Sequence, residues 1–218
     1  MGSYVLDALT TGTQNTAVGE AALNANTTAS NNSAFGHDAL KANTTGSENV
    51  AVGTNALDAN TTAANNTAVG YNSLGANTTG IQNVAVGSQA LDTNTTGSEN
   101  VAVGFNALTS NTDGTKCTAL GDQALETSTG SQNTAVGAHA LKSNTTGERN
   151  VAVGSLALDS NTTGVRNIAI GEQTLQSNTT GTANTAVGRA ALDANTTADY
   201  NSAFGYHALV ANTTGPRS

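Results

Sequence analysis

The chain lacks most of the large and charged side chains from which globular domains are built. It has no Trp, one Pro, one Cys and one Met, and aromatic residues make up 3% and charged residues 10% of its 218 residues. Ordinary domains carry about 25% charged residues. This composition excludes a conventional enzyme-like domain. One Pro excludes a collagen triple helix, and the lone Cys117 excludes an internal disulfide framework and any cysteine-based zinc site.

Charge and hydropathy exclude further partners. Fifteen acidic and seven basic residues give a formal net charge of -8, which repels phosphate backbones, so we expect no nucleic-acid partner. No run of 18 apolar residues occurs, so we expect no membrane insertion by this segment.

Motifs for catalysis or metal binding are also missing. The sequence has no phosphate-binding loop, nucleophile elbow, paired catalytic carboxylates or repetitive calcium motif. Acidic residues recur after Leu, at Asp58, Asp92, Asp159 and Asp193, but Lys41, Lys142, Gly75 and Val210 occupy the same column. That mixture favours a solvated face over a calcium site. We expect no enzymatic activity, no cofactor and no metal.

What the sequence has is one repeat. Units begin at Asn15, Asn32, Asn49, Asn66, Asn83, Asn100, Cys117, Asn133, Asn150, Asn167, Asn184 and Asn201. All twelve have 17 residues except a 16-residue unit at 117–132 and an 18-residue last one, and their consensus is N-[TVS]-A-V-G-x-x-A-L-x-x-N-T-T-G-x-x. We predict a single repeat-array domain over residues 1–218, with a partial coil at 2–14 and full coils at 15–218.

The periodicity favours strands. N-T-A-V-G alternates, is rich in β-branched residues and ends at Gly, while N-T-T-G is a turn signature. Helical repeats are about twice as long. Each unit therefore predicts one coil of an all-β solenoid, a parallel β-roll of about twelve coils, with two short strands and two turns per coil.

Stacking turns each repeat position into a column of equivalent residues. The apolar Val and Leu columns are predicted to form the coil interior; they include Val18, Leu23, Val52, Leu57, Val103, Leu108, Val153 and Leu158. The Ala between the β-branched positions is unvaried in all twelve coils and points to the opposite face. Its small size suggests packing against another chain, at positions such as Ala17, Ala51, Ala102, Ala152 and Ala186. Because so small an interior offsets the ordering cost poorly, we expect a homotrimer.

Asn forms two ladders, one from the residue that starts each coil and a second in the N-T-T turn. The members of the second ladder are Asn26, Asn43, Asn60, Asn77, Asn94, Asn144, Asn161, Asn178, Asn195 and Asn212, with Asn111 in an N-T-D variant. We expect their amides to bond along the array and to cap the turn backbone. The alternative is an exposed hydrogen-bonding surface for glycan. The coil at 117–132 breaks both Asn ladders, at Cys117 and Ser128, and indicates a tolerated turn deletion.

The tandem motif N-x-A-[VIF]-G followed by A-L resembles the head repeats of YadA-like trimeric autotransporter adhesins and the repeat shafts of bacteriophage tail fibres. The resemblance covers Gly2 to Gly215 and rests on this one short motif. It implies a left-handed parallel β-roll wound as a homotrimer and displayed at a cell or virion surface. The chain departs from the adhesin pattern in its longer coil and lacks a neck, a coiled-coil stalk and an anchor.

The expected function is a non-catalytic structural or adhesive rod, an extracellular segment of a fibrous surface adhesin or tail fibre that contacts a cell-surface glycan or receptor. The alternative is a solenoid that binds ice or polysaccharide through Thr and Asn ladders. Against ice binding, Val or Ile interrupts the Thr column before the Ala in five of twelve coils.

Overall fold

The computed structural model describes residues 2–214 and is all-β, with twelve parallel-paired strands and no helix among these residues. The chain divides into two compact units, residues 1–113 (unit 1) and 114–218 (unit 2). Each unit is a β-solenoid with one coil per repeat, which confirms the predicted fold class. A single array domain over residues 1–218 stays a prediction.

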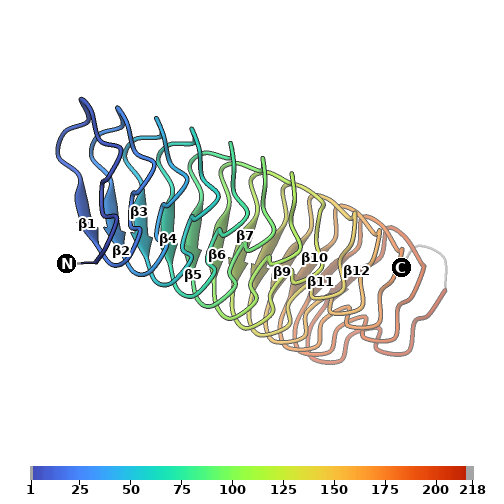
Figure 1. Ribbon diagram of the computed structural model, residues 1–218. Helices are drawn as coiled ribbons and strands as arrows, with labels where there is room; N and C mark the ends of the chain where they lie inside the picture. The colour runs from blue at the N-terminus through green and yellow to red at the C-terminus, as the bar shows by residue number, and fades with distance from the viewer. Residues whose placement is uncertain (1, 215–218) are drawn as a thin grey trace. The chain divides into compact units, whose positions relative to one another are not determined.

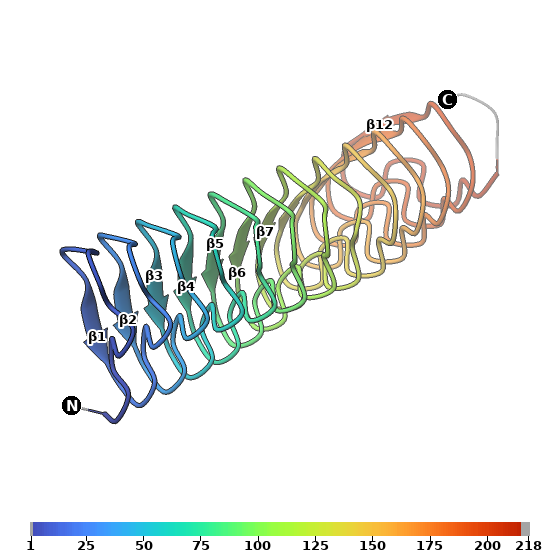
Figure 2. The same cartoon turned by 45° about the horizontal axis from the view of Figure 1, so that its top comes forward.

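Each coil contributes one strand of three residues. In unit 1 these are β1 (Thr16–Val18), β2 (Ser33–Phe35), β3 (Val50–Val52), β4 (Thr67–Val69), β5 (Val84–Val86) and β6 (Val101–Val103). In unit 2 they are β7 (Thr118–Leu120), β8 (Thr134–Val136), β9 (Val151–Val153), β10 (Ile168–Ile170), β11 (Thr185–Val187) and β12 (Ser202–Phe204). Within each unit the strands stack in chain order along one side of the coils (Figures 1 and 2).

Strand pairing keeps the repeat register. Neighbouring strands pair in parallel so that equivalent residues face each other, as Ala51 pairs with Ala34 and with Ala68. In unit 2 the shortened coil is absorbed without a slip, because Ala119 pairs with Ala135. The partial coil is also in register, since the Leu6 amide donates to the Ala22 carbonyl at 3.2 Å.

The prediction of two strands per coil is wrong. The x-A-L-x stretch is a turn, because its Leu has a left-handed backbone conformation, as at Leu57 with φ of 53°, which an extended strand does not allow. Coil-to-coil hydrogen bonds nevertheless continue there. The Leu57 amide donates to the Ser73 carbonyl of the next coil at 3.1 Å, and the Asn55 amide donates to the His37 carbonyl of the preceding coil at 3.0 Å.

The interior of each coil is small and partly polar. Leu57 is fully buried beside Ala51 and Ala56, and the two Asn of the repeat, Asn49 and Asn60, are buried with them. The Leu column is buried as predicted, at Leu23, Leu57, Leu108 and Leu158 among others. The core of a coil is thus one large apolar side chain with Ala and Asn around it.

The predicted direction of the strand residues is inverted. The Val column points outward: Val18 is 51% exposed, Val52 37%, Val103 38% and Val153 36%. The Ala column points inward and is fully buried at Ala51, Ala102, Ala152 and Ala186, with Ala17 half-buried in the first full coil. Ala therefore packs inside its own chain and is not available to a partner.

The inversion follows from the first Asn of the repeat. Asn49 must point inward because its amide donates to the Ala63 carbonyl across the coil at 2.9 Å. Residues two apart on a strand share a face, so Ala51 points inward with Asn49, and Val50 and Val52 point outward. The small size of the Ala column reflects the space left opposite the buried Leu.

One glycine is required for close stacking of the coils. Gly53 follows the strand with φ of 134°, and a Cβ on it would overlap the Gly70 carbonyl oxygen of the next coil. A side chain at this position would clash with the neighbouring backbone, so the Gly of N-x-A-V-G sets how closely successive coils approach.

Candidate functional site: the exposed strand faces

The two buried asparagines of a coil bind one carbonyl group. Nδ2 of Asn49 and Nδ2 of Asn60 both donate to the Ala63 carbonyl oxygen, at 2.9 and 3.0 Å. Between coils, the Asn49 amide N–H donates to Oδ1 of Asn32 at 2.9 Å, and Nδ2 of Asn60 donates to Oδ1 of Asn43 at 2.8 Å. The two ladders thus satisfy the buried turn backbone and their own amides.

The structure confirms the predicted turn ladder. The buried members are Asn26, Asn43, Asn60, Asn77, Asn94, Asn111, Asn144, Asn161, Asn178 and Asn195, and Asn212 is half-buried in the last coil. Because these amides are enclosed and engaged, they do not form a surface for glycan, and that alternative is wrong for the Asn ladders.

The 16-residue coil keeps the same contacts with other side chains. Sγ of Cys117 stands in for Asn Nδ2, 3.2 Å from the Gly130 carbonyl oxygen, and Oγ of Ser128 lies 3.5 Å from the same oxygen. Nδ2 of Asn144 then donates to Oγ of Ser128 at 3.0 Å. Burial raises the pKa of the Cys117 thiol, which keeps it protonated. Each Asn ladder is interrupted by one other residue here, and the coil tolerates the deletion as predicted.

The outward residues of the strands form one uncharged surface on each unit, here called the strand face. It consists of the first and third residues of each strand. The strand face of unit 1 is Thr16, Val18, Ser33, Phe35, Val50, Val52, Thr67, Val69, Val84, Val86, Val101 and Val103. The strand face of unit 2 is Thr118, Leu120, Thr134, Val136, Val151, Val153, Ile168, Ile170, Thr185, Val187, Ser202 and Phe204.

Spacing on the strand face is regular. Neighbouring strands lie about 4.8 Å apart, and the two outward residues of one strand lie about 7 Å apart along it. No side chain of either face is charged, and all are exposed or half-buried. The sequence pattern had identified these columns correctly but assigned them to the interior. The inward Asn of N-x-A-V-G was the signal that would have placed them outside.

A column of polar residues borders the strand face two residues before each strand. We call this column the leading edge. In unit 1 it is Gln14, Asn31, Glu48, Asn65, Gln82 and Glu99; in unit 2 it is Lys116, Gln132, Arg149, Arg166, Ala183 and Tyr200. All are exposed except the half-buried Ala183, and all have positive φ. Nε of Arg149 donates to Oε1 of Gln132 at 2.9 Å, so side chains of this column touch along the stack.

One of the two threonines of each N-T-T turn is used for stacking. The first Thr donates its hydroxyl to the carbonyl of the equivalent Thr in the next coil, as Thr44 does to Thr61 at 3.0 Å. The second Thr is exposed, as at Thr45 and Thr62. The exposed hydroxyls therefore lie on the turn, separate from the strand face.

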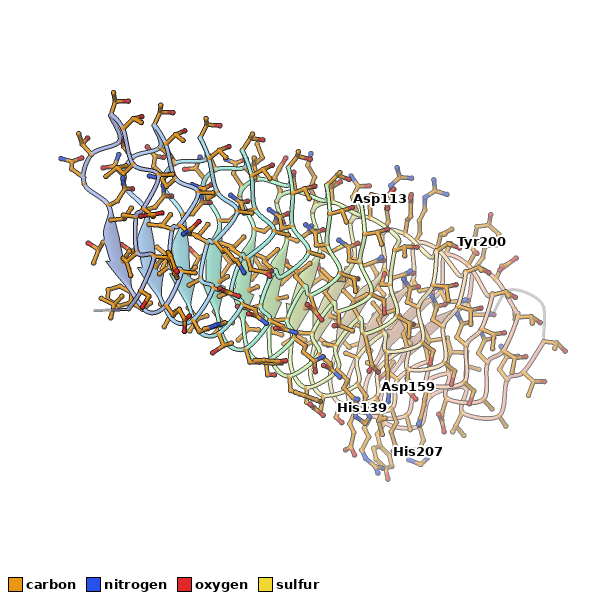
Figure 3. All side chains as sticks on the ribbon, viewed as in Figure 1. Asp113, His139, Asp159, Tyr200 and His207 are labelled. Atoms are coloured by element: carbon orange, nitrogen blue, oxygen red, sulfur yellow. The ribbon has the colours of Figure 1, made fainter. Side chains whose placement is uncertain are left out.

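Charged groups gather on the side of the coils after the strand. Nζ of Lys142 lies 3.6 Å from Oε2 of Glu126, and Nε2 of His139 lies 3.7 Å from Oδ2 of Asp122. In Figure 3, His139, Asp159 and His207 lie along one edge of unit 2, and Tyr200 lies along the other. The side chains of Lys142 and Glu126 are half-buried, those of His139 and Asp122 are more exposed, and the His139 contact is an ion pair only when the imidazole is protonated. Water screens both contacts, so each contributes on the order of 1 kcal/mol or less.

The acidic column after Leu is half-buried. Burial raises the pKa of the carboxyl groups of Asp58, Asp92 and Asp159. His139 and Lys142 partly oppose that rise at Asp159 by Coulombic attraction, while its buried Oδ1 has no hydrogen-bond partner. The column is therefore partly desolvated where a fully solvated face was expected.

Among residues 2–214 the structure contains no pocket and no group of three or more His, Cys, Asp or Glu that could hold a metal ion. The described residues also include no helix of the length and apolar character that crossing a bilayer requires. The chemistry that the surface offers is therefore that of extended faces.

Comparison of the chain with protein-family models, with curated proteins and with solved structures found no match.

Proposed function

We propose that the chain is a non-catalytic structural segment of an extracellular fibre, displayed at a cell or virion surface and able to mediate adhesion. The observation that carries this proposal is the closure of each coil on its neighbours. Asn60, for example, bonds to its own turn and to the coil before it. An array of such coils can gain or lose a repeat without a change in the fold of the remaining coils, which is the property that a spacer of variable length requires.

Removal of one whole repeat tests the structural part. Deletion of residues 49–65 should join equivalent positions and leave a folded β-solenoid with a cooperative thermal transition, measured by circular dichroism. Deletion of residues 49–57, about half a repeat, is the matched control and should unfold unit 1. If both deletions unfold the protein equally, the array is not additive and the spacer proposal fails.

Adhesion and location have their own test. Beads coated with the chain should bind cells through a surface glycan or receptor, and antibodies against the chain should label the outside of the intact source cell or virion. Labelling that requires permeabilisation would contradict the proposed location. The homotrimer now rests on the resemblance and on the small coil interior, because the Ala column that also favoured it is buried inside the chain.

The second candidate function is binding of ice or polysaccharide by the strand face. It is favoured by a regular, uncharged array of Thr, Ser and β-branched side chains that points outward. Thermal hysteresis at micromolar protein tests ice binding. Val86→Lys on the strand face should abolish the hysteresis, and Thr62→Lys on the N-T-T turn should preserve it. Absence of hysteresis in the unmodified chain would remove ice from this candidate.

A further inference from the structure

The strand faces leave an apolar surface exposed on each unit. Nine of the twelve residues on the strand face of unit 1 are apolar, and eight of twelve on that of unit 2. Phe35 is 40% exposed and Phe204 is 68% exposed. The largest exposed apolar patch of a protein is often functional, so these faces are candidate interaction surfaces.

The two units differ sharply in charge. Unit 1 contains eight acidic residues and one basic residue, a formal net charge of -7. Unit 2 contains seven acidic and six basic residues, a formal net charge of -1. Contact between unit 1 of two copies therefore meets strong repulsion, whereas contact between unit 1 and unit 2 meets little.

We propose that the strand face of unit 1 packs on the strand face of unit 2 of a second copy, with the two stacks of coils running in opposite directions. When two faces oppose each other with their strands aligned, either the stacking direction or the strand direction is reversed. Reversed stacking keeps the strand directions aligned, so leading edge lies over leading edge. Reversed strands would place each leading edge over the opposite side of the partner's face.

Full overlap of the two six-strand faces sets the register. β1 lies over the partner's β12, β3 over β10 and β6 over β7. Glu48 precedes β3 by two residues and Arg166 precedes β10 by two, so these opposite charges meet. Glu99 before β6 likewise meets Lys116 before β7. Both acidic residues on the leading edge of unit 1 thus find a basic partner.

These four charges are free to pair with a second copy. Glu48, Glu99, Lys116 and Arg166 are all exposed, and none takes part in an ion pair within the described part of a single chain. Glu148 and Asp199, each one residue before the leading edge of unit 2, reduce its positive charge, but unit 1 has no charged residue at that position.

The alternative orientation offers no such match. With reversed strands and stacks in register, unit 1 lies on unit 1, and Glu48 meets Thr54 while Glu99 meets Phe105. The proposed register also separates the bulky side chains, since Phe204 lies over Val18 and Phe35 lies over Val187. On the far side His37 meets Arg189, which already pairs with Glu172 at 3.1 Å, so attraction comes from the leading edges.

The area of one such contact suits a weak, reversible association. Six strands at about 4.8 Å spacing, with roughly 10–15 Å of exposed width, give about 300–450 Å² per face. One contact therefore buries roughly 600–900 Å² in total, the size of weak and transient interfaces.

Sedimentation equilibrium of the unmodified chain tests the association. We expect a mass that rises above the 21.5 kDa of the monomer as the protein concentration increases, and that falls back towards it as the salt concentration rises because the edge pairs are screened. A monomer at all concentrations, or an oligomer that salt does not dissociate, overturns the proposal. A salt-resistant trimer would favour the threefold assembly that the family resemblance implies.

Charge reversal tests the register. Glu48→Arg alone and Arg166→Glu alone each place like charges together, and each should weaken association about tenfold at low salt. An equimolar mixture of the two variants should restore the affinity of the unmodified chain, because each then supplies the other's partner. Asn31→Arg, at the equivalent leading-edge position opposite Ala183, is the matched control and should change the affinity less than twofold.

A second pair of variants, Glu99→Lys and Lys116→Glu, tests the other contact. This pair replaces the first pair if circular dichroism shows that either of the first two variants is misfolded. Restoration on mixing of either pair supports the pairing of opposite units. Weakening without restoration, or no weakening, overturns it.

Discussion

Units 1 and 2 contain the same kind of coil, but the Asn positions of the repeat are more regular in unit 1 than in unit 2. Each of the five coils that lie wholly within unit 1 has two inward Asn that bond one carbonyl, whereas unit 2 begins with a coil in which Cys117 and Ser128 take their places. The inward Ala and Leu are nonetheless retained in both units. The comparison shows that the coil needs a donor at each Asn position and a fixed interior volume, while the turn length can vary.

The outward residues differ in another way. Both strand faces are uncharged, but unit 1 has a net charge of -7 and unit 2 of -1. Interior positions are restricted by neighbouring coils, so they repeat. Surface charges are not restricted by stacking, so they can differ between the units at equivalent positions.

The largest effect is expected from a charge placed inside either unit. Leu57→Asp in unit 1 and Leu158→Asp in unit 2 each bury an unpaired carboxylate, and each should cost more than about 4 kcal/mol of unfolding free energy. Urea titration followed by circular dichroism measures the loss. Equal sensitivity would show that the interior is equivalent in both units.

The matched control is the neighbouring strand residue on the outer face. Val52→Asp and Val153→Asp should each change the unfolding free energy of the single chain by less than about 1 kcal/mol, because these side chains point outward. A loss as large as that of the Leu variants would contradict the assignment of inward and outward columns.

Overpacking should have the next largest effect. Ala51→Leu adds three carbons to a fully buried column and should cost about 1–3 kcal/mol. Val52→Leu, one residue later on the outer face, should be nearly neutral. The readout is the midpoint of thermal unfolding at low protein concentration, which separates this internal effect from any change in association.

The fold was predictable because every stacked coil repeats the same sequence pattern. A period of 17 residues, a strand pattern before Gly and a turn signature specify a β-solenoid. The Leu column was also correctly predicted to be buried, because a Leu side chain that recurs in every coil is more stable in the interior than in contact with water. The turn Asn were predictable as ladder residues because identical stacked amides can bond along the array.

The direction of the strand face was not predictable from hydropathy. Val is more apolar than Ala, so apolarity alone favours Val52 inside and Ala51 outside. The structure reverses this, because Asn49 must reach the Ala63 carbonyl and Ala51 shares its face. The left-handed conformation of Leu57, which ends the second predicted strand, is set by tertiary packing and has no local signature.

A smaller effect should distinguish the ladders of the two units. Asn43→Ala in unit 1 removes the donor to the Gly46 carbonyl at 2.9 Å and the acceptor for Asn60, and should cost about 1–3 kcal/mol. Ser128→Ala in unit 2 removes a longer, 3.5 Å contact and the acceptor for Nδ2 of Asn144, which still donates to the Gly147 carbonyl, and should cost about 1 kcal/mol. Equal losses in urea titration would show that the interrupted ladder of unit 2 is as strong as that of unit 1.

The smallest expected effect concerns the half-buried carboxyl groups after Leu. Burial raises the folded-state pKa of Asp92 in unit 1 and of Asp159 in unit 2 above the ordinary value of 3.8. An acid whose pKa is raised by folding is stabilised in its protonated form. The contribution of these two groups to stability is therefore most favourable below pH 3.8 and is lost as pH rises through the folded pKa, so at pH 7 both groups destabilise the chain.

Replacement of each carboxyl group by an amide sharpens the comparison between units. Asp92→Asn should raise the urea midpoint at pH 7 by a small amount and leave it unchanged at pH 3, where the wild-type carboxyl is protonated in both states. Asp159→Asn should raise it less at pH 7, because His139 and Lys142 already stabilise the charged form there. The check is the pH dependence of the difference between each variant and the unmodified chain. A gain that persists at pH 3 would mean that the amide acts through new hydrogen bonds, and an equal gain in both units would mean that the neighbouring cations of unit 2 contribute nothing.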